Sequence, residues 1–288
     1  MTITVQELVS YPVKGCSGIT VDTARVGVTG LKHDRTFMVV DAVDGAFRSQ
    51  RTHPAMAAIS VEVLDDGAAL ALSAEGVGPL RLDVDPDGPR REVSMFDRPL
   101  GAAADQGDEA AEWFSATLGA QSRLVRVVPG FDRDGWGDTP GKVNFGDAHA
   151  VLVASTASLD DLNARIAARG DATPVPMNRF RPNIVLTGDD EPHFEDRIRS
   201  MSVGTAELAH AVRATRCSVP LVDQRTGRRV GPEPVRTLAT YRREPDYGNK
   251  VSFGSKNAVV REGVVSVGDV VEVREWLSRT GPRLSPQR

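Results

Sequence analysis

The chain has 288 residues, of which 26% are charged and 40% hydrophobic, as is typical of a globular protein with one large domain or two modest ones. The formal net charge is −4 and the basic residues are scattered among acidic ones, so nothing in the charge pattern predicts nucleic-acid binding. No apolar run reaches the roughly 18 residues of a membrane span, and we expect no membrane association.

The first hundred residues alternate short β-branched segments with turns at Asp65–Gly67 and Pro86–Pro89. Strands at this spacing are typical of a barrel or a sandwich. The predicted strands are Ile3–Val13, Thr36–Asp41, Ala58–Leu64, Ala68–Ser73, Leu80–Val84 and Glu92–Met95.

A helix is predicted next, because apolar residues recur at helical spacing between Asp108, the expected N-cap, and Gly119, the expected stop. The segment 128–141 is rich in Gly, Pro and Asp, which is typical of a linker or a mobile loop. A second helix should start at the capping box Ser158–Asp161 and close at Gly170.

The rest of the second half predicts further strands and turns. They are a buried strand over Ala150–Ala154, a strand over Asn183–Thr187, paired strands over Val203–Thr215, and a hairpin over Val264–Val273 that turns at Gly268–Asp269.

Together these elements predict an α+β, β-rich fold. We expect a β-barrel-like domain over 1–125, a linker or mobile loop over 126–140, a second β-barrel domain with peripheral helices over 141–275, and a disordered tail over 276–288. A ligand site is expected between the two domains, because domain junctions often hold clefts.

Only two cysteines are present, too few for a secreted disulfide scaffold or an all-cysteine iron–sulfur cluster. The N-terminus opens on the strand-like Thr2–Gln6 without a basic or amphipathic leader, so we expect the protein in the cytoplasm. Electrons for any redox reaction would have to come from elsewhere.

Cys217 is the strongest candidate for chemistry. Arg213 and Arg216 flank it, and cationic neighbours favour the thiolate, which ligates soft metals or attacks electrophiles. Pro220 then predicts that the strand ends in a loop, where sites are common. The alternative is a reduced, buried cysteine that acts as a small hydrophobe.

Two further clusters are suited to an anion. Pro182 should hold Arg181 extended, so that Arg181 and Asn183 stand at a strand mouth; the alternative is an edge-strand salt bridge with a turn asparagine. Lys14 beside Gly15 allows close backbone approach to an anion, and Arg35 can add a bidentate clamp. The alternative there is a strand-end lysine and a surface arginine.

The sequence gives little support for other kinds of catalytic, metal or nucleotide site. The chain has no G-x-S-x-G, H-E-x-x-H, C-x-x-C or G-x-G-x-x-G motif. Its five histidines lack metal-ligand spacing, and we assign them no catalytic role; they are His33, His53, His149, His193 and His210.

In their order along the chain, these segments resemble the family of molybdenum cofactor sulfurase C-terminal domain (MOSC) proteins. The likeness is closer to the branch that includes the mitochondrial amidoxime reducing component and its bacterial relatives, and it spans nearly the whole chain. The motifs that carry it are Ser10–Cys16, Asp34–Phe37, Val143–Asp147, Ser155–Leu159, Phe180–Val185, Thr215–Cys217, Val222–Gly227, Phe253–Gly254 and Gly263–Val273.

The resemblance implies a MOSC N-terminal domain, a MOSC domain and a molybdenum–molybdopterin cofactor with Cys217 as the protein ligand to molybdenum. It implies that Asn183 hydrogen-bonds near the metal or the pterin edge. The residues that it places around the pterin and its phosphate are Lys14, Gly15, Arg35, Ser155, Arg181, Asn183, Thr215 and Arg216. Two positions depart from the branch: Pro220 stands where threonine is frequent, and Gly15 where serine is common.

The activity that this resemblance implies is reduction of N-hydroxylated compounds such as amidoximes, hydroxylamines and N-hydroxylated bases. The N–O bond breaks, the amine leaves, and two electrons and two protons release water. Since the chain has neither a cysteine set for a cluster nor a flavin motif, a separate flavin, haem or iron–sulfur reductase would donate the electrons. Pyridoxal phosphate binding is a further expectation at the level of the family.

Three other functions stay open at this point. The first is a carrier of molybdopterin or of sulfur on Cys217 without turnover, the second is a thiol enzyme without metal, and the third is a β-rich ligand-binding protein with an inert Cys217. Molybdenum content and reductase activity separate these alternatives.

Overall fold

The computed structural model describes residues 2–170 and 173–278. Over this part of the chain the strands form five sheets, in which most neighbouring strands are antiparallel. The β-rich α+β class predicted from the sequence is confirmed.

The largest sheet joins the second half of the chain to the N-terminus. In spatial order its strands are β22 (Val271–Trp276), β15 (Ile198–Val203), β16 (Ala206–Arg216), β20 (Lys250–Arg261), β13 (Val151–Ser155), β14 (Ile184–Thr187), β1 (Thr4–Ser10) and β3 (Ile19–Val21), with β19 (Arg243–Glu244) paired to β20. β1 pairs antiparallel with β14. β13 and β14 are parallel, and helix α2 (Thr156–Ala168) forms the crossover that parallel neighbours need.

The first half of the chain forms two further sheets. One contains β10 (Arg90–Met95), β11 (Arg98–Asp105), β12 (Ser122–Arg126), β6 (Phe37–Asp41) and β2 (Val13–Lys14), and the other contains β7 (Ser60–Leu64), β8 (Ala69–Ala74) and β9 (Val77–Asp83). Helix α1 (Gly107–Leu118) packs on β12 and β9. Its buried Trp113 and Phe114 join Leu70 and Leu72 of β8 in one apolar core.

The remaining strands are short. β21 (Gly263–Ser266), β4 (Thr23–Gly27) and β5 (Gly30–Leu31) form one small sheet, and β17 (Val222–Asp223) and β18 (Arg228–Arg229) form another. Helix α3 (Val235–Leu238) and six 3-10 helices complete the described elements: η1 (Pro54–Ala58), η2 (Asp65–Gly67), η3 (Met177–Phe180), η4 (Phe194–Arg197), η5 (Val219–Leu221) and η6 (Pro245–Tyr247).

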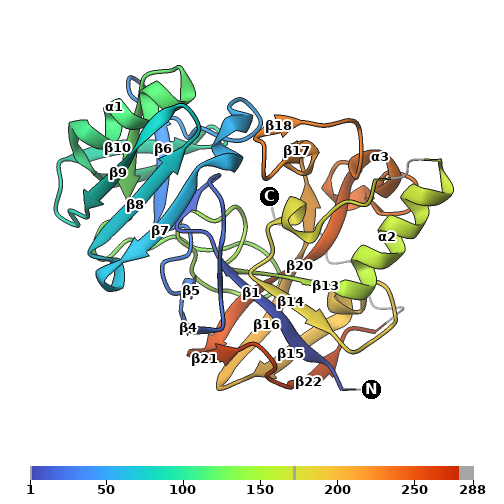
Figure 1. Ribbon diagram of the computed structural model, residues 1–288. Helices are drawn as coiled ribbons and strands as arrows, with labels where there is room; N and C mark the ends of the chain where they lie inside the picture. The colour runs from blue at the N-terminus through green and yellow to red at the C-terminus, as the bar shows by residue number, and fades with distance from the viewer. Residues whose placement is uncertain (1, 171–172, 279–288) are drawn as a thin grey trace.

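Figure 1 shows how these elements gather. α1 and β6 to β10 lie together on one side of the molecule, whereas α2, α3 and the strands β13 to β16 and β20 lie on the other. β1 runs from the first group into the second, where it lies beside β14.

The predicted hairpin over Val264–Val273 is wrong. The turn at Gly268–Asp269 exists, but β21 pairs with β4 and β22 pairs with β15. Both strands reach the same apolar core from different sheets, through Val265 and Val271. The two strands diverge after the turn because each already has another partner strand.

Both predicted helix starts need correction. α1 begins at Gly107 after Gln106, and Asp108 lies in its first turn; Gly119 ends the helix in the left-handed conformation, as predicted. α2 begins three residues earlier than predicted, because the hydroxyl of Ser155 accepts from the backbone N–H of Ser158.

The segment 128–141 has no helix or strand, but hydrogen bonds tie it to the second half. The Thr139 hydroxyl donates to the carbonyl of His210 (2.6 Å), and the Asp138 N–H donates to that of Ala211 (2.7 Å). The predicted domain limits stay predictions, and residues 279–288 of the predicted tail lie outside the described residues. Among the described residues, no helix has the length and apolarity to cross a membrane.

Candidate functional site

A pocket opens where loops of the first half of the chain meet the ends of β14 and β16. The empty space between its lining residues, open solvent included, is about 890 Å³. Eight of the nine predicted site residues are among those that line it: Lys14, Gly15, Arg35, Arg181, Asn183, Thr215, Arg216 and Cys217. The structure does not place Ser155 with them.

The lining of the pocket is strongly basic. Its charged residues are one carboxylate, Asp147, and eight basic side chains: Lys14, Arg35, Arg48, Arg51, Arg179, Arg181, Arg216 and Lys256. The whole chain, in contrast, has a formal net charge of −4. Folding therefore gathers basic residues that are scattered in the sequence, and the pocket is suited to a ligand with several negative charges.

Two arginines lie against one buried aromatic ring. The guanidinium carbons of Arg35 and Arg181 are 4.8 and 4.2 Å from the ring centroid of Tyr11. The Tyr11 hydroxyl donates to the carbonyl of Pro182 (3.2 Å), and burial raises its pKa to about 12, so it stays protonated. The expectation that Arg181 is extended is wrong: it is left-handed, with φ 54°, as it ends η3. In this backbone conformation, the guanidinium of Arg181 lies over the Tyr11 ring.

Asn183 holds the base of the site together. Its amide nitrogen donates to the Val9 carbonyl (3.1 Å) and to Oδ1 of Asp34 (2.9 Å). Its Oδ1 accepts from the Leu152 N–H (3.1 Å) and from Arg35 (3.0 Å). These four bonds use the whole hydrogen-bonding capacity of an asparagine side chain. In this arrangement Asn183 positions Arg35, and its expected hydrogen bond near the metal or the pterin edge stays a prediction.

Gly15 approaches the pocket through its backbone. Its φ is +90°, a conformation that strains other residues, and an added Cβ would lie 2.9 Å from Cε of Met56. The Gly15 carbonyl accepts from Nε2 of Gln50 (2.7 Å). Gln50 and Gln224 exchange two side-chain hydrogen bonds, and Gln224 also accepts from Arg181 (3.1 Å). The Gly15 carbonyl thus holds Gln50, and the Gln50–Gln224 pair links the first half of the chain to the second.

Asp147 is a lining residue to which sequence reasoning assigned no role, although the motif Val143–Asp147 contains it. Lys14 donates to its Oδ1. Partial burial raises the pKa of this carboxyl, but Lys14 and Lys256 outweigh that effect and hold the pKa well below its ordinary value. Asp147 is therefore ionised near neutral pH, and it offsets part of the positive charge.

Cys217 follows the last residue of β16 and has an exposed side chain. The other cysteine, Cys16, is sealed in the apolar core, where burial raises its pKa to about 12. Arg216 is held beside Cys217 by two carbonyls, those of Phe253 (3.1 Å) and Phe180 (3.0 Å). Arg213, the other cation expected to favour the thiolate, is not a lining residue; it pairs with Glu244 (3.3 Å).

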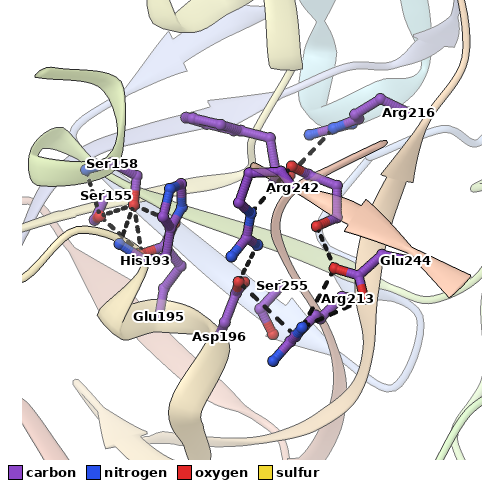
Figure 2. Close-up of polar contacts among 12 residues, drawn as sticks. Ser155, Ser158, His193, Glu195, Asp196, Arg213, Arg216, Arg242, Glu244 and Ser255 are labelled. Atoms are coloured by element: carbon purple, nitrogen blue, oxygen red, sulfur yellow. Dashed lines mark hydrogen bonds and ion pairs between the residues drawn. The ribbon is translucent and has the colours of Figure 1, made fainter. Parts of the chain in front are cut away.

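Ser155 belongs to a buried polar network next to α2, shown in Figure 2. The hydroxyls of Ser155 and Ser158 both donate to the carboxylate of Glu195 (2.8 Å). The adjacent Asp196 pairs with Arg242. Ser155 thus caps a helix and binds an internal carboxylate, which explains why this motif residue is absent from the pocket.

Stability should depend on pH through Glu195. Burial and then the charge of Asp196 raise the pKa of Glu195 to about 7, above its ordinary 4.5. Stabilisation by the protonated form is therefore fully present below pH 4.5 and lost as the pH rises through about 7. The measurement is urea unfolding between pH 4.5 and 8. We expect the free energy of unfolding of Glu195→Gln to rise relative to that of wild type as the pH rises, by about 3 kcal/mol in all. Parallel curves would contradict this role, and Glu112→Gln, at an exposed position of α1, is the control.

The fold and the site define a β-rich protein of two connected halves with a cationic small-molecule pocket and one accessible thiol. The MOSC N-terminal beta barrel domain matches residues 2–121, and the MOSC domain matches residues 140–272. The chain belongs to the MOSC domain family, as the sequence resemblance predicted.

Three relatives illustrate the similarity. The mitochondrial amidoxime-reducing component 1 of Mus musculus is 34% identical over 93% of this chain and 81% of its own length. The mitochondrial amidoxime reducing component 2 of Bos taurus is 31% identical over 93% of this chain and 82% of its own length. The molybdenum cofactor sulfurase of Oryza sativa subsp. japonica is 30% identical over 88% of this chain, but only 32% of its own length is matched.

Proposed function

We propose that the chain reduces N-hydroxylated compounds with a molybdenum–molybdopterin cofactor and with electrons from a separate protein. The observation that carries the proposal is the exposed thiol of Cys217 in a pocket lined by eight basic residues and one carboxylate. The names of the two amidoxime-reducing relatives support the same reaction class.

The residues present fit such a cofactor. Within residues 2–170 and 173–278, no group of three or more His, Cys, Asp or Glu side chains is arranged to hold a metal ion. Cys217 is a single soft ligand, so it suits a metal that arrives with sulfur ligands of its own. The basic lining suits the phosphate of a pterin cofactor.

In this proposal Cys217 is the protein ligand to molybdenum, and the bound cofactor supplies two-electron redox chemistry. Lys14, Arg35, Arg181 and Arg216 provide the positive charge that holds the anionic cofactor, while Gly15 and Thr215 shape its edges. Asn183 keeps Arg35 in place, and Gln224 does the same for Arg181.

The overall reaction converts an amidoxime, two electrons and two protons into an amidine and water. The N–O bond breaks, the nitrogen takes one proton to form the N–H of the amidine, and the hydroxyl oxygen takes the other proton and leaves as water. The electron donor is a separate flavin, haem or iron–sulfur protein. The cytoplasmic location and pyridoxal phosphate binding stay predictions.

The test uses protein purified from cells that make molybdopterin. Molybdenum content is measured first, and benzamidoxime reduction is then followed with reduced methyl viologen as electron source. Stoichiometric molybdenum with benzamidine formation is the expected result. Molybdenum without turnover would favour the carrier, and absence of molybdenum from fully folded protein would overturn the proposal.

A further inference from the structure

Lys256 reaches the pocket from the middle of β20. Its strand neighbours Ser255 and Asn257 are fully buried, and Ser255 bonds His210 on that face (2.8 Å). Because successive strand side chains point to opposite faces, Lys256 points the other way, and it is a lining residue of the pocket. Neither Ser255 nor Asn257 lines the pocket.

The ammonium of Lys256 makes no hydrogen bond or ion pair with any residue of the described part of the chain. Most other lining cations are held by a neighbour. Lys14 is held by Asp147, Arg35 by Asp34, Arg48 by Asp41, Arg179 by Asp223, Arg181 by Gln224, and Arg216 by the carbonyls of Phe180 and Phe253. Lys256 is thus a cation whose donors remain for a ligand.

The charges that face Lys256 are mostly of its own sign. Burial lowers its pKa to about 8; Asp147 opposes the shift, while Arg216, Arg35 and Lys14 add to it. The ammonium remains the main form at pH 7. A negative charge brought next to it would relieve repulsion among these cations as well as bind the ammonium.

The backbones of Lys256 and Cys217 are separated along the direction of β16 and β20. Arg216, just before Cys217, pairs with Val251, whereas Lys256 is five residues further along β20 and pairs with Val212. A substrate whose N–OH group is directed to the thiol end therefore extends its other end toward Lys256.

We propose that Lys256 makes the pocket selective for N-hydroxylated substrates that carry a carboxylate at the end remote from the N–OH group. The inference rests on the proposed function, because it concerns the substrate of that same site. The carboxylate accepts a hydrogen bond from the ammonium and adds a negative charge where Asp147 is the one carboxylate among the lining residues.

The experiment compares two substrates that differ only in charge, benzamidoxime and 4-carboxybenzamidoxime, with reduced methyl viologen as electron source. Wild type, Lys256→Met and Lys256→Arg are measured beside Lys250→Met, a control at an exposed lysine of the same strand. We expect Lys256→Met to lower the kcat/KM ratio of the charged over the neutral substrate about tenfold or more. Lys256→Arg should recover most of the ratio, and Lys250→Met should keep it.

A second measurement needs no turnover. Calorimetric binding of 4-amidinobenzoate and benzamidine, the two products, should show the same loss of discrimination in Lys256→Met. In wild type the discrimination should decline as the pH rises through about 8, as the ammonium loses its proton. An unchanged ratio in Lys256→Met, in both assays, would overturn the inference. Discrimination in binding that depends on Lys256, without N–O reduction by any variant, would support the carboxylate contact and overturn the proposed reaction.

Discussion

Cys217→Ala is expected to reduce the turnover of N-hydroxylated substrates at least about a hundredfold while most of the bound pterin is retained. Loss of groups that merely orient a metal ligand costs about 10- to 100-fold, so loss of the ligand itself should cost no less. The pterin should remain because its anionic part is held by basic residues that this substitution leaves in place.

The structure also predicts little change in stability. The Cys217 side chain is exposed, and Arg216 is anchored by backbone carbonyls that do not depend on the thiol. Removal of an exposed side chain without such contacts should change the free energy of unfolding by no more than about 0.5 kcal/mol.

The measurements are benzamidoxime turnover, molybdenum by mass spectrometry, and pterin by fluorescence after oxidation. X-ray absorption at the molybdenum edge should show one sulfur neighbour fewer. Cys16→Ala is the matched control: it deletes a buried thiol at a cost of about 1 kcal/mol and should keep its activity. A Cys217→Ala protein that retained a tenth of the wild-type turnover would refute the ligand assignment.

Local patterns in the sequence predicted most of the individual strands. Alternation and turn residues marked β6, β7 and β8 to within about two residues, and Gly119 marked the end of α1. Strand pairing was harder to predict, because a partner is chosen by contacts distant in sequence. The residues around Gly268 have the pattern of a hairpin, yet β21 pairs with a strand more than two hundred residues earlier in the chain.

For the site too, local sequence predicted some residues and missed those that only folding brings together. Motifs located the thiol and the residues next to it, because those residues are adjacent in the chain. They gave no role to Arg48, Arg51, Arg179 or Lys256, which meet in the pocket only after folding. Ser155 and Asn183 show the converse: both are motif residues, but internal partners use their hydrogen-bonding groups. Which polar group is left for a ligand is a property of the folded state.

Asn183→Leu should lower the free energy of unfolding by about 4 kcal/mol. The substitution keeps the volume similar but deprives the Leu152 N–H, the Val9 carbonyl, Arg35 and Asp34 of a partner. Each buried polar group left without a partner costs about 1–3 kcal/mol, and rearrangement recovers part of the sum.

Urea unfolding at pH 7 measures the effect, with Asn178→Leu as control because Asn178 is exposed. The control should change stability by no more than about 0.5 kcal/mol. Asn183→Asp adds a test of the geometry: its carboxylate would face Asp34, which now accepts from the Asn183 amide at 2.9 Å. Two carboxylates at that distance repel, so this variant should lose stability as the pH rises and its new carboxyl ionises. If Asn183→Leu stayed within about 1 kcal/mol of wild type, the hydrogen bonds of Asn183 would contribute little to stability. Arg35 would then have to be positioned by Asp34, the Arg181 carbonyl and Tyr11.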